Sequence, residues 1–329
     1  MNENAIDFVL IWVDDSDPQW QAERQKYMVE DGRFMNPNNS RYRDWGLLRY
    51  WFRCVEKNAP WVRKIHLVTC GHYPEWLNLN HPKLNFVKHD DYIPAKYLPT
   101  FSSHPIELNL HRIDGLAEQF VYFNDDLFVL APVKPTDFFK NGLPRDCALR
   151  VFPVVYDIGL INMNDINIIN KEFYFKKQFK KNIWKWLNYR YGLSMIRNII
   201  FWHYEYFTGA KVPHLANAFK KSTFEEVWKK YGNTLDNTCQ HKFRSPLDVN
   251  QWLIKYWQIV SGEFYPRNLN LGKHYYISNT KQLEKDLKNK RTKLVCLAEN
   301  DEMTDISQLK QEVINIFQQV YPNKSSFEL

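Results

Sequence analysis

The chain has few cysteines, and they lie far apart. Its five cysteines are scattered and form no close pair, so the sequence predicts neither a zinc cluster nor a disulfide framework. Thiols of this kind are typical of a reduced, cytosolic environment. We therefore expect a cytoplasmic protein. Separately, a chain of 329 residues is long enough to bury a substantial core.

Long apolar runs are also missing. No stretch reaches the roughly 18 consecutive apolar residues that a membrane span needs, and the N-terminus lacks a basic segment followed by an apolar run. There is no internal repeat, low-complexity run or clear linker. The sequence predicts a soluble or peripheral protein with one elaborated domain over residues 1–329.

Positive charge and aromatic side chains are what the chain has in excess. The net charge of +7 favours an anionic partner such as a nucleotide, a nucleic acid or an acidic lipid surface, without choosing among them. Aromatic residues make up 16% of the chain and suit both sugar stacking and core packing. Because no nucleic-acid-binding module signature accompanies the charge, we do not expect a nucleic-acid partner.

Apolar strand-like segments alternate with helical patterns in the first part of the chain. Strands are expected over 6–13, 64–69 and 84–88 and from residue 120 up to the pair Asp125-Asp126, and a short helix over 105–113. This order predicts an α/β fold with a Rossmann-like, mostly parallel sheet flanked by helices. In such sheets ligands bind outside the carboxyl ends of the strands.

Polar residues follow each of these strands at the end where a ligand would bind. They are Asp14, Thr69, His89 and the pair Asp125-Asp126. Each of them alone is explained as a polar turn or a helix N-cap. Four polar strand ends on one edge of the sheet are harder to explain in that way, so their convergence predicts an active site.

The two adjacent carboxylates are the strongest candidates for chemistry. Asp125 and Asp126 can hold a divalent cation beside phosphate oxygens, because hard cations take oxygen ligands. A second junction of strand and acid occurs where 294–297 runs into Glu299 and Asp301.

Residues 171–207 interleave many aromatic side chains with lysine and arginine. Two interpretations stay open for this segment. It can lie on an anionic membrane surface as a peripheral contact, or it can be a set of helices packed on the sheet with a solvated basic face.

Several stretches together resemble the Stealth family, which includes bacterial capsular polysaccharide phosphotransferases and the N-acetylglucosamine-1-phosphotransferase that marks lysosomal enzymes. Its first region resembles residues 6–18, and its second resembles the stretch from Arg41-Tyr42-Arg43-Asp44 to Asn124-Asp125-Asp126. The third resembles Pro213-His214 with Phe243-Arg244-Ser245, and the fourth resembles the stretch from Cys296-Leu297 to Asn300-Asp301. In the fourth region Ala298-Glu299 intervenes before the usual Asn-Asp, so either Glu299 or Asp301 is the matching acid.

The resemblance implies transfer of a hexose 1-phosphate from a UDP-sugar to a glycan hydroxyl, with release of UMP and growth of a phosphodiester-linked capsular or exopolysaccharide. It implies a nucleotide-sugar half over 1–150, a helical basic and aromatic insertion with the acceptor side over 151–270, and a strand and helix over 271–329 that complete the site. The acceptor would be an oligosaccharide or a lipid-linked glycan at the inner face of the bacterial membrane.

The resemblance also implies roles for individual residues. Catalysis is expected from His214 as base, Arg244 on the phosphoryl oxygens, and Asp126. The metal, Mg²⁺ or Mn²⁺, is expected on Asp125, Asp126 and Asp301. Substrate binding is expected from Trp12, Asp14, Thr69, Ser103, Glu107 and Arg112.

Two other functions fit the same residues. A metal-dependent glycosyltransferase would also bind a nucleotide sugar through paired acids, but would transfer the sugar itself and release the nucleoside diphosphate. A non-catalytic glycan-binding protein of capsule assembly would need no convergence of His214, Arg244 and the acidic junctions.

Overall fold

A five-stranded sheet forms the centre of the molecule. The computed structural model describes residues 5–32, 42–152, 157–300, 303 and 305–329. The strands of the main sheet, in spatial order, are β3 (Leu84–Lys88), β2 (Ile65–Thr69), β1 (Ile6–Ile11), β4 (Gln119–Phe123) and β8 (Asn217–Lys220). The first four are parallel, and β8 runs antiparallel to β4. The predicted Rossmann-like, mostly parallel sheet is therefore confirmed.

The order of the strands identifies where a ligand fits. The chain runs outward from β1 to β2 and β3, then crosses back to place β4 on the other side of β1. The carboxyl ends of β1 and β4 thus lie at the point where the strand order reverses, which is the usual ligand crevice of such sheets.

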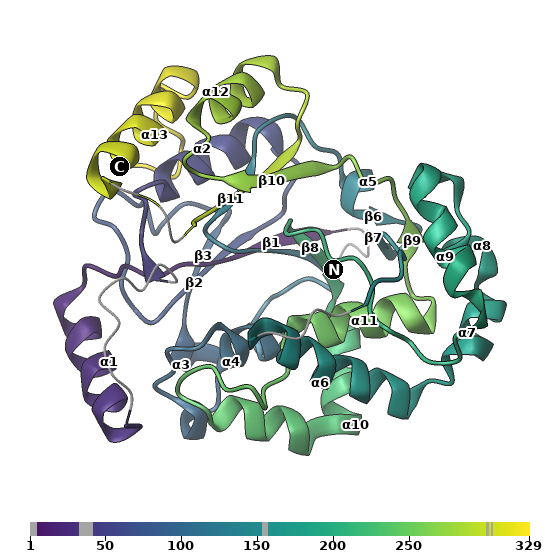
Figure 1. The fold of residues 1–329 in the computed structure, drawn as a ribbon. Coiled ribbons are helices and arrows are strands. Elements are labelled where there is room, and N and C mark those ends of the chain that lie inside the picture. Colours follow the sequence, from purple (N-terminus) through teal and green to yellow (C-terminus); the bar gives the residue numbers. More distant parts are fainter. Residues whose placement is uncertain (1–4, 33–41, 153–156, 301–302, 304) are drawn as a thin grey trace.

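Helices cover both faces of the main sheet (Figure 1). On one face lie α2 (Leu48–Asn58), α12 (Thr280–Asn289) and α13 (Ile306–Val320). On the other lie α3 (His89–Tyr92), α4 (Ser103–Leu108), α6 (Asp157–Glu172), α10 (Lys221–Gln240) and α11 (Gln251–Ser261). Helix α1 (Pro18–Glu30) lies apart at one side, where Asp17 caps its first turn by accepting from the amides of Gln19 and Trp20.

The strands of the main sheet are apolar throughout because both of their faces are buried. Phe8 and Leu10 of β1 pack in the cluster on the α2 face, whereas Val9 packs in the cluster on the α11 face. In the same way Phe123 and Tyr122 of β4 belong to opposite clusters. This alternation gives the sheet two separate cores.

Two small sheets complete the fold. One contains β10 (Gly272–Tyr276), β11 (Leu294–Ala298) and β5 (Leu127–Val129), and the other contains β6 (Phe139–Lys140), β7 (Leu143–Asp146) and β9 (Tyr265–Pro266). Strand β5 begins directly after Asp126, and Cys296 of β11 pairs with Leu127. The C-terminal strand is thereby brought to the carboxyl end of β4.

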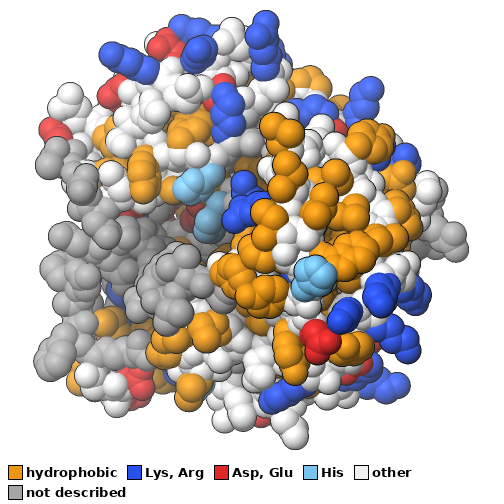
Figure 2. Space-filling view, turned by 45° about the vertical axis from the view of Figure 1, so that its right-hand side comes forward, with side chains coloured by type: hydrophobic (Ala, Val, Ile, Leu, Met, Phe, Trp, Pro, Cys, Tyr) orange, Lys and Arg blue, Asp and Glu red, His pale blue; other side chains and the backbone are white. Residues whose placement is uncertain are grey.

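The middle of the chain is helical and returns to the main sheet through β8. Its outermost part consists of α7 (Phe175–Lys181), α8 (Ile183–Trp186), η4 (Tyr189–Met195), α9 (Ile196–Ile200) and η5 (Phe201–His203). Figure 2 looks more directly onto this side of the molecule and shows many apolar side chains at its surface. No helix in the described part of the chain is long and apolar enough to cross a membrane.

The helix expected over 105–113 is wrong in its bounds. The structure has α4 up to Leu108 and then a separate short helix, η3 (Leu110–Arg112). The break falls at Asn109, whose side-chain amide donates to the carbonyl oxygen of Pro105 at 2.8 Å. A side chain that competes for backbone groups in this way favours the end of a helix. The remaining short helices are η2 (Ala95–Tyr97) and α5 (Pro135–Phe138).

Candidate active site

A cavity of about 350 Å³ opens at the carboxyl ends of β1 and β4. His89, one of the polar strand ends that predicted the site, lines the cavity. Five residues with predicted catalytic, metal or substrate roles also line it: Trp12, Ser103, Asp125, Asp126 and Arg244. They come from four separate stretches of the chain. The order of the strands explains why they meet. The carboxyl ends of β1 and β4 lie at this edge of the main sheet, and ligands bind at such an edge.

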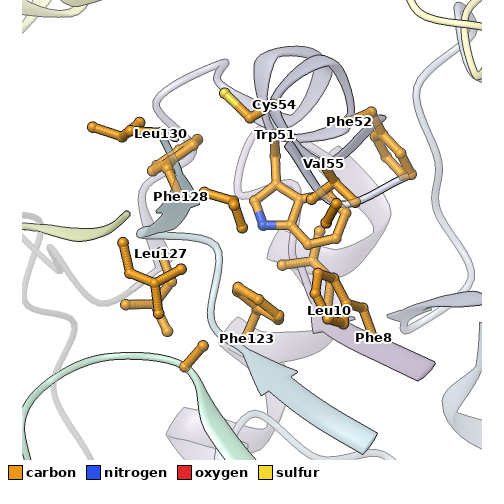
Figure 3. Packing of buried hydrophobic residues seen from close by; sticks show 14 of the residues in the cluster. Phe8, Leu10, Trp51, Phe52, Cys54, Val55, Phe123, Leu127, Phe128 and Leu130 are labelled. Atoms are coloured by element: carbon orange, nitrogen blue, oxygen red, sulfur yellow. The ribbon is translucent and has the colours of Figure 1, made fainter. Parts of the chain in front are cut away.

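The apolar core forms the back wall of the cavity. Leu10 of β1, Trp51 of α2 and Phe128 of β5 all line it. Figure 3 shows Trp51 directed from α2 toward the strands, and its ring centroid lies 5.6 Å from that of Phe123. A close-packed wall of this kind holds the polar groups at the front of the cavity in fixed positions.

The paired acids lie in a tight turn between β4 and β5. The amide of Leu127 donates to the carbonyl oxygen of Asn124 at 3.2 Å, which closes the turn. Asp126 accepts a hydrogen bond at Oδ2 from the thiol of Cys296 at 3.2 Å. Its other oxygen, Oδ1, is buried and has no hydrogen-bond partner. Buried carboxylate oxygens usually have a hydrogen-bond partner, so the Oδ1 atom is available to a cation or another ligand in the cavity.

The surroundings of both acids disfavour negative charge. Burial within the cavity raises the pKa of Asp125 well above its usual range, and the charge of Asp126 raises it further. As a whole residue, Asp125 is nevertheless exposed to solvent. Burial also raises the pKa of Asp126, although the Cys296 thiol and the nearby histidines oppose this rise. The site therefore attracts positive charge.

Two stacked histidines lie beside Asp126. The rings of His214 and His274 are nearly parallel, at 20°, with centroids 5.6 Å apart. Both are close enough for their charge to lower the pKa of Asp126. Burial and the neighbouring His214 lower the pKa of His274, so its ring is neutral at neutral pH. His214 itself is exposed, at the mouth of the site and not in the cavity wall.

Glu299 lines another side of the cavity, where it is paired with an arginine. Its carboxylate forms a salt bridge with Arg43 and accepts from Nε1 of Trp45 at 2.5 Å. All three residues line the cavity. Asp301 lies outside the described residues, so which of these two acids completes the fourth region stays a prediction.

Trp12 and Asp14 hold the end of β1 in place. Nε1 of Trp12 donates to Asp44 Oδ1 at 3.3 Å, and the amide of Asp14 donates to Nε2 of His72 at 2.9 Å. The carboxylate of Asp14 accepts from the amide and hydroxyl of Ser16. Burial raises the pKa of Asp44, and the charge of Asp14 adds to this effect. Asp14 thus belongs to the rim, whereas Trp12 and Asp44 line the cavity.

Arg244 reaches the cavity from a loop that a buried carboxylate anchors. One of its guanidinium nitrogens, Nη2, donates to the hydroxyl of Ser103 at 3.0 Å. Behind it, fully buried Asp248 binds Nδ1 of His104 at 2.8 Å, Nδ1 of His241 at 2.6 Å and the amide of Ser245 at 2.9 Å. The loop and α4 are therefore joined at the position of Arg244.

Besides Asp14, three other residues predicted to bind substrate lie outside the cavity wall. The hydroxyl of Thr69 closes the turn after β2, where it donates to the carbonyl oxygen of His72 at 2.8 Å. Glu107 is buried behind the wall and accepts from the hydroxyl of Tyr122 at 3.1 Å. Arg112 is directed toward α10, with its guanidinium 4.9 Å from the ring of Trp228. The structure shows contacts of these side chains within the protein, and their roles in substrate binding stay predictions.

The acids at the cavity suit a magnesium or manganese ion only together with a substrate. Among residues 5–32, 42–152, 157–300, 303 and 305–329, no three histidine, cysteine or carboxylate side chains form a ready-made metal cage. Mg²⁺ is usually bound through one or two carboxylates plus the phosphates of a substrate. Asp125 and Asp126, with the unpartnered Oδ1 atom of Asp126, fit that arrangement.

Sequence reasoning missed His274, Cys296 as a partner of Asp126, and Asp248. The alternation in 272–276 is compatible with a strand, but nothing in it reveals that His274 pairs with Cys296 of β11. Asp248 follows Arg244 closely in the sequence, and this closeness was a signal for its role near the site. Its burial and its contacts are visible only in the structure.

The chain was compared with known proteins. Models of three conserved regions of Stealth proteins match it: region 1 at residues 4–30, region 2 at 41–146 and region 3 at 213–260. It is 43% identical to the capsular polysaccharide phosphotransferase WcwK of Streptococcus pneumoniae, over 99% of both chains. It is 40% identical to the receptor polysaccharide phosphotransferase WefC of Streptococcus oralis, over 99% of this chain and 100% of that one.

Two further similarities are more distant. The exopolysaccharide phosphotransferase cps2G of Lactiplantibacillus plantarum is 36% identical, over 98% of this chain and 96% of its own. The apo structure of the bifunctional glycosyltransferase WbbM aligns with a TM-score of 0.38 at 10% identity, over 97% of this chain and 52% of that one, which is too low to carry an argument. The full-length relatives and the three matching regions show that this chain belongs to the Stealth family and is a phosphotransferase.

Proposed function

We propose that the protein transfers a hexose 1-phosphate, such as an N-acetylhexosamine 1-phosphate, from a UDP-sugar to a hydroxyl of a glycan. The product is a phosphodiester link in a capsular or exopolysaccharide, and UMP is released. One observation carries this proposal. Asp125, Asp126 and Arg244 line the same cavity, and His214 lies beside Asp126 at its mouth. Relatives that cover the whole chain are named capsular, receptor or exopolysaccharide phosphotransferases.

The proposed reaction is attack of the acceptor oxygen on the phosphorus that carries the sugar. A bond forms between that phosphorus and the acceptor oxygen, and the bond to the bridging oxygen of the diphosphate breaks. The acceptor proton passes to a base, and the electron pair of the broken bond leaves with UMP. Such a transfer depends on positioning and on stabilising charge on the phosphoryl oxygens.

His214 is the proposed base. It lies at the exposed mouth of the site, where a glycan hydroxyl has access, and close to the carboxylate of Asp126. A neutral imidazole can accept a proton near neutral pH. His274 stacks on its ring and restricts its orientation.

Arg244 is the proposed ligand of the phosphoryl oxygens. Guanidinium groups bind phosphate with two parallel hydrogen bonds. Its contacts to Ser103 and its anchored loop hold the guanidinium at the cavity before substrate arrives. The aromatic side chains of Trp12 and Trp45 line the same cavity and can pack against the nucleotide.

Asp125 and Asp126 are the proposed ligands of Mg²⁺ or Mn²⁺, with Asp301 as a further candidate. When bound, the cation would neutralise charge on the diphosphate and on the departing nucleotide. Since the cation would supply this neutralisation, we expect a strict requirement for the metal.

The proposed place of action is the cytoplasmic side of the bacterial membrane, with a lipid-linked or oligosaccharide acceptor. The five cysteines are free, including the four that are buried. This state fits a reducing compartment.

The identity of the released nucleotide tests the proposal. Purified protein is incubated with candidate UDP-sugars, Mg²⁺ and an oligosaccharide acceptor, and the products are separated. Release of UMP that depends on acceptor, and that is lost in His214→Ala, supports phosphoryl transfer. Release of UDP would mean that the attack is on the sugar carbon, as in a metal-dependent glycosyltransferase. Glycan binding without turnover of any donor would favour the non-catalytic role.

A further inference from the structure

An apolar surface covers the outermost helices of the middle region. We call the exposed apolar side chains of residues 183–206 the apolar face. Its most exposed members are Leu193 (87%), Tyr189 (75%), Tyr206 (66%) and Ile200 (64%). Figure 2 shows apolar side chains gathered together on this side of the molecule, with lysine and arginine around them. Contiguous exposed patches of this kind mark sites of interaction.

Helix α9 buries a single side chain, that of Asn198, and leaves Arg197 and its isoleucines exposed. Asn198 is fully buried, and its side-chain amide donates to the carbonyl oxygens of Ala148 and Trp186, both at 2.6 Å. The isoleucines on the other side, Ile196 and Ile199, are about half exposed, at 50% and 49%. A helix on the surface of a soluble protein shows the opposite arrangement. Apart from Arg197, the exposed side chains of this helix are therefore apolar.

Helix α8 also exposes a large aromatic ring, although its other tryptophan, Trp186, is fully buried. Lys185 is buried and donates through Nζ to the carbonyl oxygen of Gly262, whereas Trp184 beside it is 51% exposed. Burying a lysine while exposing a tryptophan costs free energy in water on both counts. Both helices therefore expose large apolar side chains at the surface while they bury a polar one.

The segment after α9 is held rigidly. Arg150 is fully buried, and its guanidinium donates to the carbonyl oxygens of Phe201 and, at 2.6 Å, Tyr206. With these carbonyl groups bound inside, the exposed rings of Trp202 and Tyr204 are held at the surface between them. The apolar face is thus preformed.

The charge of this region selects the partner. Residues 173–213 contain eight lysines and arginines and one acid, Glu205, which pairs with Lys176 at 3.1 Å. In α7 the rings of Phe175 and Phe179 are buried, whereas Lys177 and Lys180 are exposed. Basic side chains around apolar and aromatic ones match an anionic lipid surface, where tryptophan and tyrosine favour the headgroup level.

We propose that the apolar face binds the surface of an anionic bilayer. Leu193, Ile196 and Ile199 enter the boundary between headgroups and acyl chains, and the lysines of α7 contact the headgroups. This assignment is narrower than the whole of 171–207, because the aromatic residues of α7 belong to the core. The inference concerns a surface and does not depend on the chemistry proposed above.

The apolar face is joined to the mouth of the candidate active site by a short stretch of the chain. The chain leaves it at Tyr206, passes Ala210, which bridges to Arg150, and then reaches His214. If the proposed function holds, a protein bound through this face meets an acceptor carried by a lipid at the mouth where His214 lies.

Vesicle sedimentation tests the proposal. The full chain is mixed with vesicles of phosphatidylcholine alone, or of phosphatidylcholine with phosphatidylglycerol, at low and at high salt. We expect binding to the anionic vesicles that weakens with salt. The triple variant Leu193→Ser/Ile196→Ser/Ile199→Ser should bind about a hundredfold more weakly, since each aliphatic side chain loses its burial in lipid.

Matched controls separate this effect from a general loss of surface apolarity. Val29 and Leu329 are exposed to a similar degree, at 66% and 68%, and lie outside the region. The variant Val29→Ser/Leu329→Ser should bind vesicles like the wild type. In α7, Lys177→Gln/Lys180→Gln should weaken binding to anionic vesicles by more than about tenfold, as each basic residue near the surface contributes roughly 1 kcal/mol.

Three outcomes overturn the proposal. They are no binding of the wild type to anionic vesicles at low salt, equal binding by the triple variant, and concentration-dependent dimers that the triple variant abolishes without any vesicle binding. The last would identify a second copy of the chain as the occupant. UMP release with a water-soluble acceptor, measured without vesicles, tests the proposed function separately, so the two proposals can fail independently.

Discussion

The thiol of Cys296 donates a hydrogen bond to Oδ2 of Asp126 at 3.2 Å. The bond connects the C-terminal strand β11 to the turn after β4, across 170 positions of the sequence. It leaves Oδ1 of Asp126 as the oxygen without a partner. Since burial and the adjacent carboxylate raise the pKa of Cys296, the thiol stays protonated and remains a donor. Cys296 therefore orients the carboxylate that we propose as a metal ligand.

We predict that Cys296→Ala lowers activity more than Cys296→Ser does. Serine keeps a donor at the position, whereas alanine removes it and leaves Oδ2 of Asp126 unpaired. Loss of a hydrogen bond behind a metal ligand typically reduces metal affinity or activity by about 10- to 100-fold. The measurement is UMP release as a function of Mg²⁺ concentration. Cys54→Ala, at another buried thiol away from the cavity, controls for lost packing; equal losses in all three variants would contradict the orienting role.

We predict that Asp125→Asn and Asp126→Asn each reduce turnover by about a hundredfold or more, as removal of charge stabilisation from a phosphoryl-transfer site does. Asparagine keeps the shape of the side chain, so the fold should remain. The measurement is UMP release at saturating Mg²⁺, with thermal unfolding alongside. Asp114→Asn, at an exposed position outside the cavity lining, should keep full activity. Full activity in both cavity variants would show that the reaction does not need a metal bound by Asp125 and Asp126.

We predict different consequences for the two stacked histidines. His214→Gln should lower the rate by about a hundredfold or more, the usual contribution of a general base. His274→Gln should have a smaller effect, because the ring of His274 is neutral at neutral pH and glutamine keeps its polarity. Rates across pH with a soluble acceptor measure both. A larger loss of rate in His274→Gln than in His214→Gln would mean that His274, and not His214, is the general base.

The fold was predictable because its strands follow simple rules. Both faces of the main sheet are covered, so its strands appear as apolar runs that end in polar residues, and Asp125-Asp126 was found from that pattern. The cavity lining includes Trp12, Ser103 and Arg244, which were expected from the family resemblance. Their roles in catalysis stay predictions.

The remaining site residues depend on contacts that no local pattern encodes. His274 reaches Asp126 only because β10 pairs with β11 in one register, and β11 pairs with β5. Thr69 was expected at the ligand because it ends a strand, but its hydroxyl is used by the turn it begins. Arg112 was expected in the site from the family region, yet the break at Asn109 turns it toward α10.

At the opposite end of the sheet from the cavity, Asp7 is fully buried and forms a salt bridge with Arg63. It also binds Nε2 of His66 at 3.0 Å and the amide of Ala117 at 2.8 Å. Burial alone would raise the pKa of Asp7, but the hydrogen bonds from His66 and Arg63 lower it below the usual 3.8. A carboxylate with a lowered pKa in the folded state stabilises the fold above its unfolded pKa, and that contribution is lost as the pH falls through the folded value.

We therefore predict that Asp7→Asn destabilises the fold by about 3 kcal/mol at neutral pH, as the removal of one partner from a buried ion pair does. The difference between the variant and the wild type should shrink as the pH falls below about 4, since the wild-type carboxyl then also loses its charge. Urea unfolding of both proteins from pH 7 down to pH 3 measures this. Activity per folded molecule should not change, because Asp7 lies at the amino end of β1, far along the strand from Trp12. A difference in stability that stays constant over this range would show that packing, and not the charge of Asp7, holds this end of the sheet.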